Sequence, residues 1–405
     1  MRKVAATATT IALLAIGCGP GSAVHQGGEL ATSDTLFVRT ISGIEGLEVA
    51  SGEVRVSFPG GIASPDFGVV ATARINGGAT TIRLLTSAGK ELTRAKVPGS
   101  LVPRVVSGNG DLTALTEPAE AASTGYVAAP RLSTRIVVVD SSGRARELEM
   151  KGNFEPEAFS TNTEQLFAIE YLPPEAPDRY LVRTIDIASG EVEPIGRLKI
   201  SVGEQMQGTG RTHVYAPGGN ELYTLYTQQP DASGTGSGSA FIHQLNLKGA
   251  WAHCIVLPRE LADADAQSAA LAVDPGGTRI FVADWEAGVV AVAEPGRAKA
   301  SAVAHHDFDT PAAQTFAEAT YDRLFVAGGS RVAVIEADSL EAVDMWSVEG
   351  EIGGMAISPD ERWIYVSLAD RVVILDAATG REMATIGGLQ PTSIEHVASA
   401  EGSHT

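Results

Sequence analysis

The feature of this sequence that most constrains its fold is a pattern of short strands and turns that recurs from position 61 onward. The clearest copy contains a turn and four apolar runs: Ser358-Pro359-Asp360, preceded by Gly354–Ile357 and followed by Trp363–Ser367, Arg371–Asp376 and Glu382–Ile386. β-Branched and aromatic runs of this length fit a pleated, buried surface, and Pro with Asp or Gly supplies tight turns. The pattern therefore predicts a repeated unit of four antiparallel strands.

The spacing of the copies predicts how many units there are. Copies start near Gly61, Pro103, Glu155, Gly210, Ala269, Ala312, Ile352 and Pro391. A four-stranded propeller blade takes ~40–45 residues, and loops account for the longer intervals. The chain also contains 44 glycines, which indicates many tight turns because the usual share is ~7%. We predict an all-β fold, a β-propeller of seven or eight four-stranded blades, with the count favouring eight.

The two ends of the repeated region complement each other. The copy that starts at Pro391 holds a single strand, whereas residues 35–58 contain three strands without an inner partner. Pairing the two would close the ring in one composite blade and remove exposed sheet edges. We therefore expect strand closure between the N-terminal and C-terminal parts of a propeller domain over residues 34–399, followed by a disordered tail over 400–405.

Two segments resemble a known repeat. SPDERWIYVSLADRVVILDAATGRE, from Ser358, and VDPGGTRIFVADWEAGVVAVAE, from Val273, are similar to the YVTN-type β-propeller repeat of bacterial surface and secreted proteins. The similarity is clear over residues 268–389 and weaker over 61–260, where other turn residues replace the motif. The resemblance implies a propeller. Propellers of this kind serve as binding platforms, lactonases and quinoprotein dehydrogenases, so the fold leaves the function open.

The N-terminus carries an export pattern. Two basic residues precede the apolar run Ile11–Ile16, which is too short to span a bilayer and fits a secretory signal. Leu14–Cys18 resembles a bacterial lipobox, whose cysteine is lipidated and becomes the mature N-terminus, although leucine stands one position earlier than usual. We expect a lipoprotein signal peptide over residues 1–17. The alternative is an ordinary signal peptide cut near Ser22-Ala23, with Cys18 discarded.

Lipidation would fix the location of the protein. The Gly/Ser-rich segment 18–33 reads as a flexible tether. The expected location is the outer, extracytoplasmic face of the bacterial cell membrane, reached through a lipid on Cys18. Because Cys254 is the only other cysteine, no disulfide framework is expected, and Cys254 itself is predicted to be buried in a strand.

Charge and motifs exclude several functions. The chain has 30 Lys and Arg against 49 Asp and Glu, a net charge of −19, which disfavours binding to nucleic acid. The motifs of zinc proteases, phosphate-binding loops and serine hydrolases are missing. His305-His306-Asp307 and the pair Asp263 and Asp265 lack the spacing of metal sites. No cofactor and no metal is therefore predicted.

Three consecutive copies carry long insertions between their second and third strands, at 117–133, 171–180 and 228–239. Equivalent loops of a propeller lie on one face, so these insertions would form a raised sector. Tyr126, Tyr171 and Tyr180 lie in or beside these loops, and Trp285 lies in the equivalent short loop of the next copy. These four are our candidate partner- or ligand-binding residues, because aromatic side chains favour recognition surfaces. The alternative is that the loops are merely variable and the aromatics incidental.

Two functional hypotheses follow. The first is a non-catalytic binding platform for an envelope protein or a small ligand. The second is a propeller enzyme, lactonase-like or quinoprotein-like, which needs polar side chains that converge on the central channel. Residues near the first strands of the copies are the candidates for that convergence: Arg104, Glu157, Arg211 and Glu318.

Overall fold

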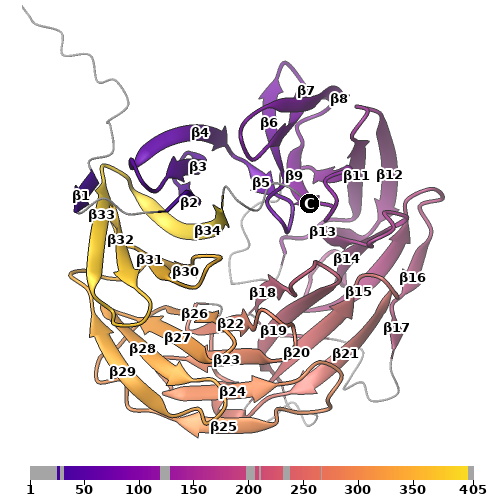
Figure 1. Cartoon of the computed structure of the whole chain (residues 1–405). Helices are drawn as coiled ribbons and strands as arrows, with labels where there is room; N and C mark the ends of the chain where they lie inside the picture. Colours follow the sequence, from indigo (N-terminus) through magenta and orange to yellow (C-terminus); the bar gives the residue numbers. More distant parts are fainter. Residues whose placement is uncertain are drawn as a thin grey trace, which may run out of the picture.

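The computed structural model of the chain describes residues 25–27, 32–118, 128–197, 206–208, 211–230, 238–265 and 267–399. These residues form eight β-sheets, each built on four antiparallel strands and arranged in a ring (Figure 1). Neighbouring innermost strands contact one another from blade 1 to blade 3 and from blade 4 to blade 8. The predicted all-β propeller, and the count of eight, are confirmed.

We number the blades in chain order and give each from its innermost to its outermost strand. Blade 1 contains β5 (Ile62–Ala63), β6 (Val69–Asn76), β7 (Ala79–Thr86) and β8 (Glu91–Pro98). Blade 2 contains β9 (Val102–Val106), β10 (Leu112–Thr116), β11 (Ser133–Asp140) and β12 (Ala145–Lys151). Blade 3 contains β13 (Asn153–Phe159), β14 (Gln165–Leu172), β15 (Arg179–Asp186) and β16 (Val192–Pro194). Blade 4 contains β18 (Arg211–Tyr215), β19 (Glu221–Gln229), β20 (Ser239–Asn246) and β21 (Trp251–Val256).

The second half of the ring repeats this order. Blade 5 contains β22 (Ala269–Val273), β23 (Ile280–Asp284), β24 (Val289–Ala293) and β25 (Ala302–His305). Blade 6 contains β26 (Thr315–Ala319), β27 (Arg323–Gly328), β28 (Arg331–Glu336) and β29 (Ala342–Ser347). Blade 7 contains β30 (Gly354–Ile357), β31 (Trp363–Ser367), β32 (Arg371–Asp376) and β33 (Glu382–Gly387). Blade 8 contains β34 (Pro391–Ser399), β2 (Asp34–Thr40), β3 (Gly43–Glu48) and β4 (Glu53–Pro59).

Three short elements complete the description. β1 (His25–Gly27) pairs with β33 on the outer edge of blade 7, within the segment that the sequence predicts as a flexible tether. β17 (Gly196–Arg197) pairs in parallel with β21, and the 3₁₀ turn η1 (Arg259–Leu261) lies between blades 4 and 5. No helix among the described residues is long and apolar enough to cross a membrane.

Blade 8 joins the two ends of the chain as the sequence predicts. β34 supplies the inner strand and pairs antiparallel with β2, which places Leu36 opposite Val397. Arg39 on β2 donates two hydrogen bonds of 2.9 Å to the carboxylate of Glu395 on β34. These contacts close the ring between segments that are more than 350 residues apart in the sequence.

The turns between the first and second strands share a local structure in four blades. A buried serine at the end of the inner strand lies 2.5–2.8 Å from the Oδ1 atom of an Asp or Asn two residues later, in the pairs Ser64–Asp66, Ser107–Asn109, Ser160–Asn162 and Ser358–Asp360. The same serine Oγ accepts a backbone N–H five residues on, as from Val69 to Ser64. Such side-chain bonds to the turn backbone hold these turns in place.

Neighbouring blades approach closely where glycine meets tryptophan. A Cβ atom on Gly380 of blade 7 would lie 2.3 Å from the indole of Trp346 in blade 6. A Cβ atom on Gly328 of blade 6 would lie 2.4 Å from the indole of Trp285 in blade 5. Both glycines are therefore required by packing between blades. Cys254 on β21 is also buried in a blade interface, as predicted.

Candidate functional site

The inner strands surround two cavities. The larger, of about 660 Å³, opens on the face that carries the turns between first and second strands. The smaller, of about 350 Å³, is lined by the opposite ends of the inner strands of blades 4 to 8. Leu271, Ala317 and Glu318 line both cavities, which places these residues where the two meet in the channel.

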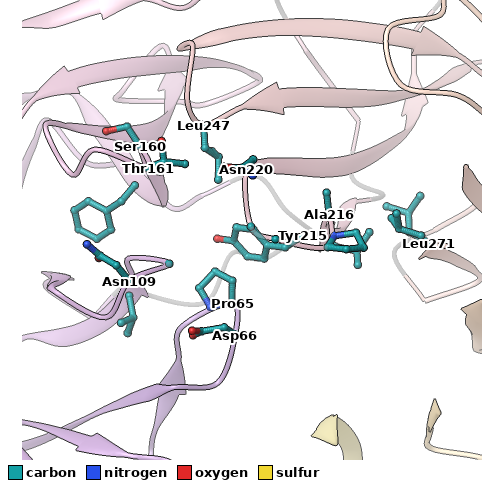
Figure 2. Close-up of a pocket in the computed structure, with 18 of the residues that line it drawn as sticks. Pro65, Asp66, Asn109, Ser160, Thr161, Tyr215, Ala216, Asn220, Leu247 and Leu271 are labelled. Carbon is teal, nitrogen blue, oxygen red and sulfur yellow. The ribbon is translucent and has the colours of Figure 1, made fainter. Parts of the chain in front are cut away.

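The larger cavity is off-centre and is built mainly by blades 1 to 4. Their turns contribute Asp66, Asn109, Thr161 and Asn220, and blades 5 and 6 contribute strand residues on the other side (Figure 2). Asp66 and Asn109 belong to the serine-fixed turns described above, so their positions are held by hydrogen bonds within each turn. The rim of this cavity is therefore formed before any ligand arrives.

Tyr215, the last residue of β18, extends into this cavity between Pro65 and the turns of blades 3 and 4 (Figure 2). Burial raises the pKa of its phenol well above the usual value, and the nearby carboxylate of Glu157 adds to the shift. The phenol therefore keeps its proton. Its hydroxyl makes no hydrogen bond to any described residue, so it can pair with a ligand in the cavity.

The ionisable side chains that carry carboxyl groups into the larger cavity are Asp66 and Glu318. Asp66 lies at its rim and Glu318 at its inner end, and the described lining contains no Lys, Arg or His. Burial in the channel raises the pKa of Glu318 to about 8. The neutral carboxyl group therefore predominates at pH 7, where it can donate one hydrogen bond and accept another.

The structure brings only part of the predicted channel set together. Glu318 lines the cavity, whereas Arg104 donates hydrogen bonds to Thr116 and to the backbone oxygen of Glu117. Glu157 is close enough to Tyr215 to influence its pKa. The side chain of Arg211 lies outside the described residues. The strand register shifts at Arg104 and at Glu157, and such β-bulges redirect the side chain that they insert.

The aromatic candidates on the opposite face are placed differently from the prediction. Tyr171 and Tyr180 are each 2% exposed and pack in the core between blades 3 and 4. Tyr171 donates a hydrogen bond to Glu155 at 2.7 Å, and Tyr180 donates one to the backbone oxygen of Gln207 at 3.0 Å. The expectation that these rings present contact area on raised loops is wrong for both, because neighbouring strands cover them.

Trp285 is buried as well. Its ring stacks on Phe308 at 4.3 Å, and its Nε1 donates a hydrogen bond to the backbone oxygen of Thr310. It therefore supports the interface with blade 6 and offers no exposed surface. Tyr126 and Cys18 lie outside the described residues. Recognition by the loops themselves stays a prediction.

The histidine and aspartate candidates for metal binding do not gather with other ligands. Among the described residues there is no group of three or more His, Cys, Asp or Glu side chains placed to hold a metal ion. His306 stacks on Phe308, and Asp265 accepts hydrogen bonds from the backbone of Gln267 and Ser268. Both residues have structural partners.

Comparison with known proteins supports the fold. No protein-family model and no curated protein matches the sequence. Among solved structures, apo AztD from Citrobacter koseri is similar with a TM-score of 0.58 and 12% identity, over 91% of this chain and 98% of that one. The dihydro-heme d1 dehydrogenase NirN, in complex with DHE, has a TM-score of 0.51 and 14% identity, over 91% and 75% of the two chains. Sqt1 from Saccharomyces cerevisiae has a TM-score of 0.52 and 12% identity, over 84% of this chain and 89% of that one. Identities this low show a shared propeller fold and leave function to the site.

Sequence reasoning missed Tyr215 and the cavity around it. The signal was present, since the Ser-x-Asx turns of blades 1 to 3 occupy the same place in successive repeats and must share one face. The insertions between the second and third strands vary in length, and the sequence-based prediction therefore placed the recognition surface on the opposite face. A search for polar residues adjacent to the repeated turns would have found Asp66 and Asn109.

Proposed function

We propose that this protein is an extracytoplasmic binding protein whose propeller holds a small organic ligand in the larger channel cavity. The observation that carries the proposal is a cavity of about 660 Å³ with a preformed rim and an uncommitted Tyr215 hydroxyl inside it. Ligand sites of proteins are typically concave, of this size, and mostly apolar with a few fixed polar groups.

The lining favours a neutral or cationic ligand. Apolar walls come from Phe159, Val214 and Leu271, and the polar groups are the oxygens and amides described above. Because Asp66 adds a carboxylate and the described lining offers no cation, an anionic ligand would be desolvated without a counter-charge. Hydrogen-bond donors on the ligand would meet Asp66 and the Tyr215 hydroxyl.

A ligand screen tests this proposal. The melting temperature of the purified protein would be measured with neutral, cationic and anionic compounds that fit the cavity. The affinity of each compound that raises the melting temperature would then be measured by calorimetry. Replacing Tyr215 by Phe should weaken the affinity for the tightest-binding compound about fivefold, because one hydrogen bond is lost. Tyr321→Phe is the matched control, since Tyr321 is exposed on a turn of blade 6. Hits confined to anions, or equal affinity of the two variants, would overturn the proposal.

The second part of the proposal is the membrane anchor. It rests on the lipobox-like Leu14–Cys18, since a thioether-linked lipid would anchor the chain through its buried acyl chains. Cys18→Ser should move the protein from the membrane fraction to the soluble fraction or leave the precursor uncleaved. Unchanged fractionation and unchanged mature mass would contradict lipidation.

We do not advance the propeller-enzyme alternative. Its requirement is a set of catalytic groups that converge, and the described cavity lining brings Glu318 together with no His, Cys or Lys. Of the described candidates for that convergence, Glu318 is the one that lines the cavity.

A further inference from the structure

One face of blade 1 changes from apolar to basic along its strands. Val70 on β6 pairs with Leu85 on β7, and both pack against Phe37 and Phe58 of blade 8. Because side chains alternate along a strand, every second residue shares this face. Further along, the same face presents cationic side chains at Arg74, Arg83, Arg94 and Lys96.

Blade 8 covers the apolar part of this face and leaves the basic part open. A cavity of about 540 Å³ lies there, walled by Pro59 at the end of β4. Its other lining residues come from β6, β7 and β8 and include Thr72, Asn76 and Thr81. The opposite face of blade 1, with Ile82 and Leu84, is buried against blade 2. The basic groove therefore is a hollow between two blades and shares no lining residue with the channel.

The cations in this groove are partly preorganised. Glu91 accepts hydrogen bonds from Arg94 at 2.8 and 2.9 Å and from Arg83 at 2.6 Å. The hydrogen bonds from these two guanidinium groups lower the pKa of Glu91 to about 2, and the bond from Arg94 has the larger effect. The carboxylate therefore stays ionised and holds both arginines. Arg74 forms no ion pair with any described residue. Arg83 and Arg94 lie directly opposite each other on neighbouring strands, and Glu91 offsets one of their two positive charges, so with Arg74 the groove keeps an excess of positive charge.

We propose that this groove between blades 1 and 8 binds a ligand that carries phosphate groups. One guanidinium group can donate two parallel hydrogen bonds to two oxygens of a phosphate. Thr72, Thr81 and Asn76 can add hydrogen bonds to the remaining oxygens. The volume suits a small molecule with two phosphates or the headgroup of a phospholipid. This site is independent of the proposed ligand site in the channel. The two sites share no lining residue, and the groove carries basic side chains whereas the channel cavity carries acidic ones.

The test uses the chain from residue 19 onward, which leaves out the expected signal peptide and the cysteine expected to carry the lipid and keeps every described residue. In one arm, pyrophosphate is titrated by calorimetry at low and at high salt. In the other, vesicles of phosphatidylglycerol are compared with vesicles of phosphatidylcholine by flotation. We expect saturable binding in at least one arm, weakened by salt. Binding in the first arm identifies a soluble phosphate ligand, and binding in the second alone identifies a lipid headgroup.

Single substitutions decide whether the groove is responsible. Arg74→Gln should weaken binding about tenfold, because a charge-assisted hydrogen bond is removed from an exposed side chain on which folding does not depend. Arg381→Gln is the matched control, an exposed arginine on the hairpin of blade 7. Equal affinity of the two variants, or no saturable binding in either arm, would overturn the proposal.

Discussion

The buried contact between blade 7 and the closing blade offers a sharp test of how the ring is held. Tyr365 on β31 is fully buried, and its hydroxyl donates a 2.6 Å hydrogen bond to Oδ2 of Asp34, the first residue of β2. Burial, with the carboxylate of Asp34 as the next cause, raises the pKa of Tyr365, so its hydroxyl remains a donor. The residues are 331 positions apart. Tyr365→Phe removes this one hydroxyl and keeps the ring.

The structure sets the expected magnitude. Asp34 is 5% exposed, and this bond is the one that its side chain makes with a described residue. Water cannot readily replace the lost donor there, so the carboxylate oxygen would stay buried without a partner. Hydrogen bonds to charged groups contribute about 1.5–3 kcal/mol, and we expect Tyr365→Phe to lower the free energy of unfolding by about 2 kcal/mol.

The assay is equilibrium urea unfolding followed by fluorescence and circular dichroism. Tyr321→Phe serves as the control, because this exposed tyrosine loses the same hydroxyl without burying a carboxylate. A double-mutant cycle with Asp34→Asn should show coupling between the two positions. A loss below about 0.5 kcal/mol, or purely additive effects, would refute the idea that this contact stabilises ring closure.

Truncation after Leu389 removes β34 and should abolish the cooperative unfolding transition, because β2 loses its inner partner and its edge becomes exposed; a truncated protein that melts like the wild type would contradict the closure. Gly328→Ala places a Cβ against Trp285 and should cost about 1–3 kcal/mol by urea unfolding, whereas unchanged stability would mean that the indole moves freely. Burial raises the pKa of Glu318 to about 8, so the folded state binds the carboxyl proton more tightly than the unfolded state does. The stability that this proton contributes is complete below the unfolded pKa of about 4.3 and is lost as the pH rises through 8. Glu318→Gln should therefore make the melting temperature depend less on pH between about pH 5 and 9, and a pH profile identical to that of the wild type would count against the raised pKa. Replacing residues 231–237 by a two-residue turn should leave the melting temperature unchanged, since Gln229 already pairs with Ser239, and a large decrease would show that this loop packs on the domain.

The sequence predicted most of the fold because its signals are local. Strands such as Trp363–Ser367 are recognisable from β-branched and aromatic runs, and turns such as Ser358-Pro359-Asp360 from residues with defined backbone preferences. The single strand at Pro391 and the three unpaired strands of residues 34–59 already implied closure. The candidate site was predicted less well. Of the channel residues proposed from sequence, Glu318 lines the cavity, and Tyr215 was not among them.

By itself, then, the sequence determined the strands, the turns and the closure and favoured eight blades over seven, since each depends on residues within one repeat or on the count of repeats. Tertiary structure decided which side chains meet. Tyr171 and Trp285 stand beside loops in the sequence but are covered by neighbouring strands, whereas Tyr215 projects into the channel. The physical reason is that burial and convergence depend on the rotation from blade to blade and on the width of the closed ring. Those quantities arise from packing between blades, which a local pattern of residues does not encode.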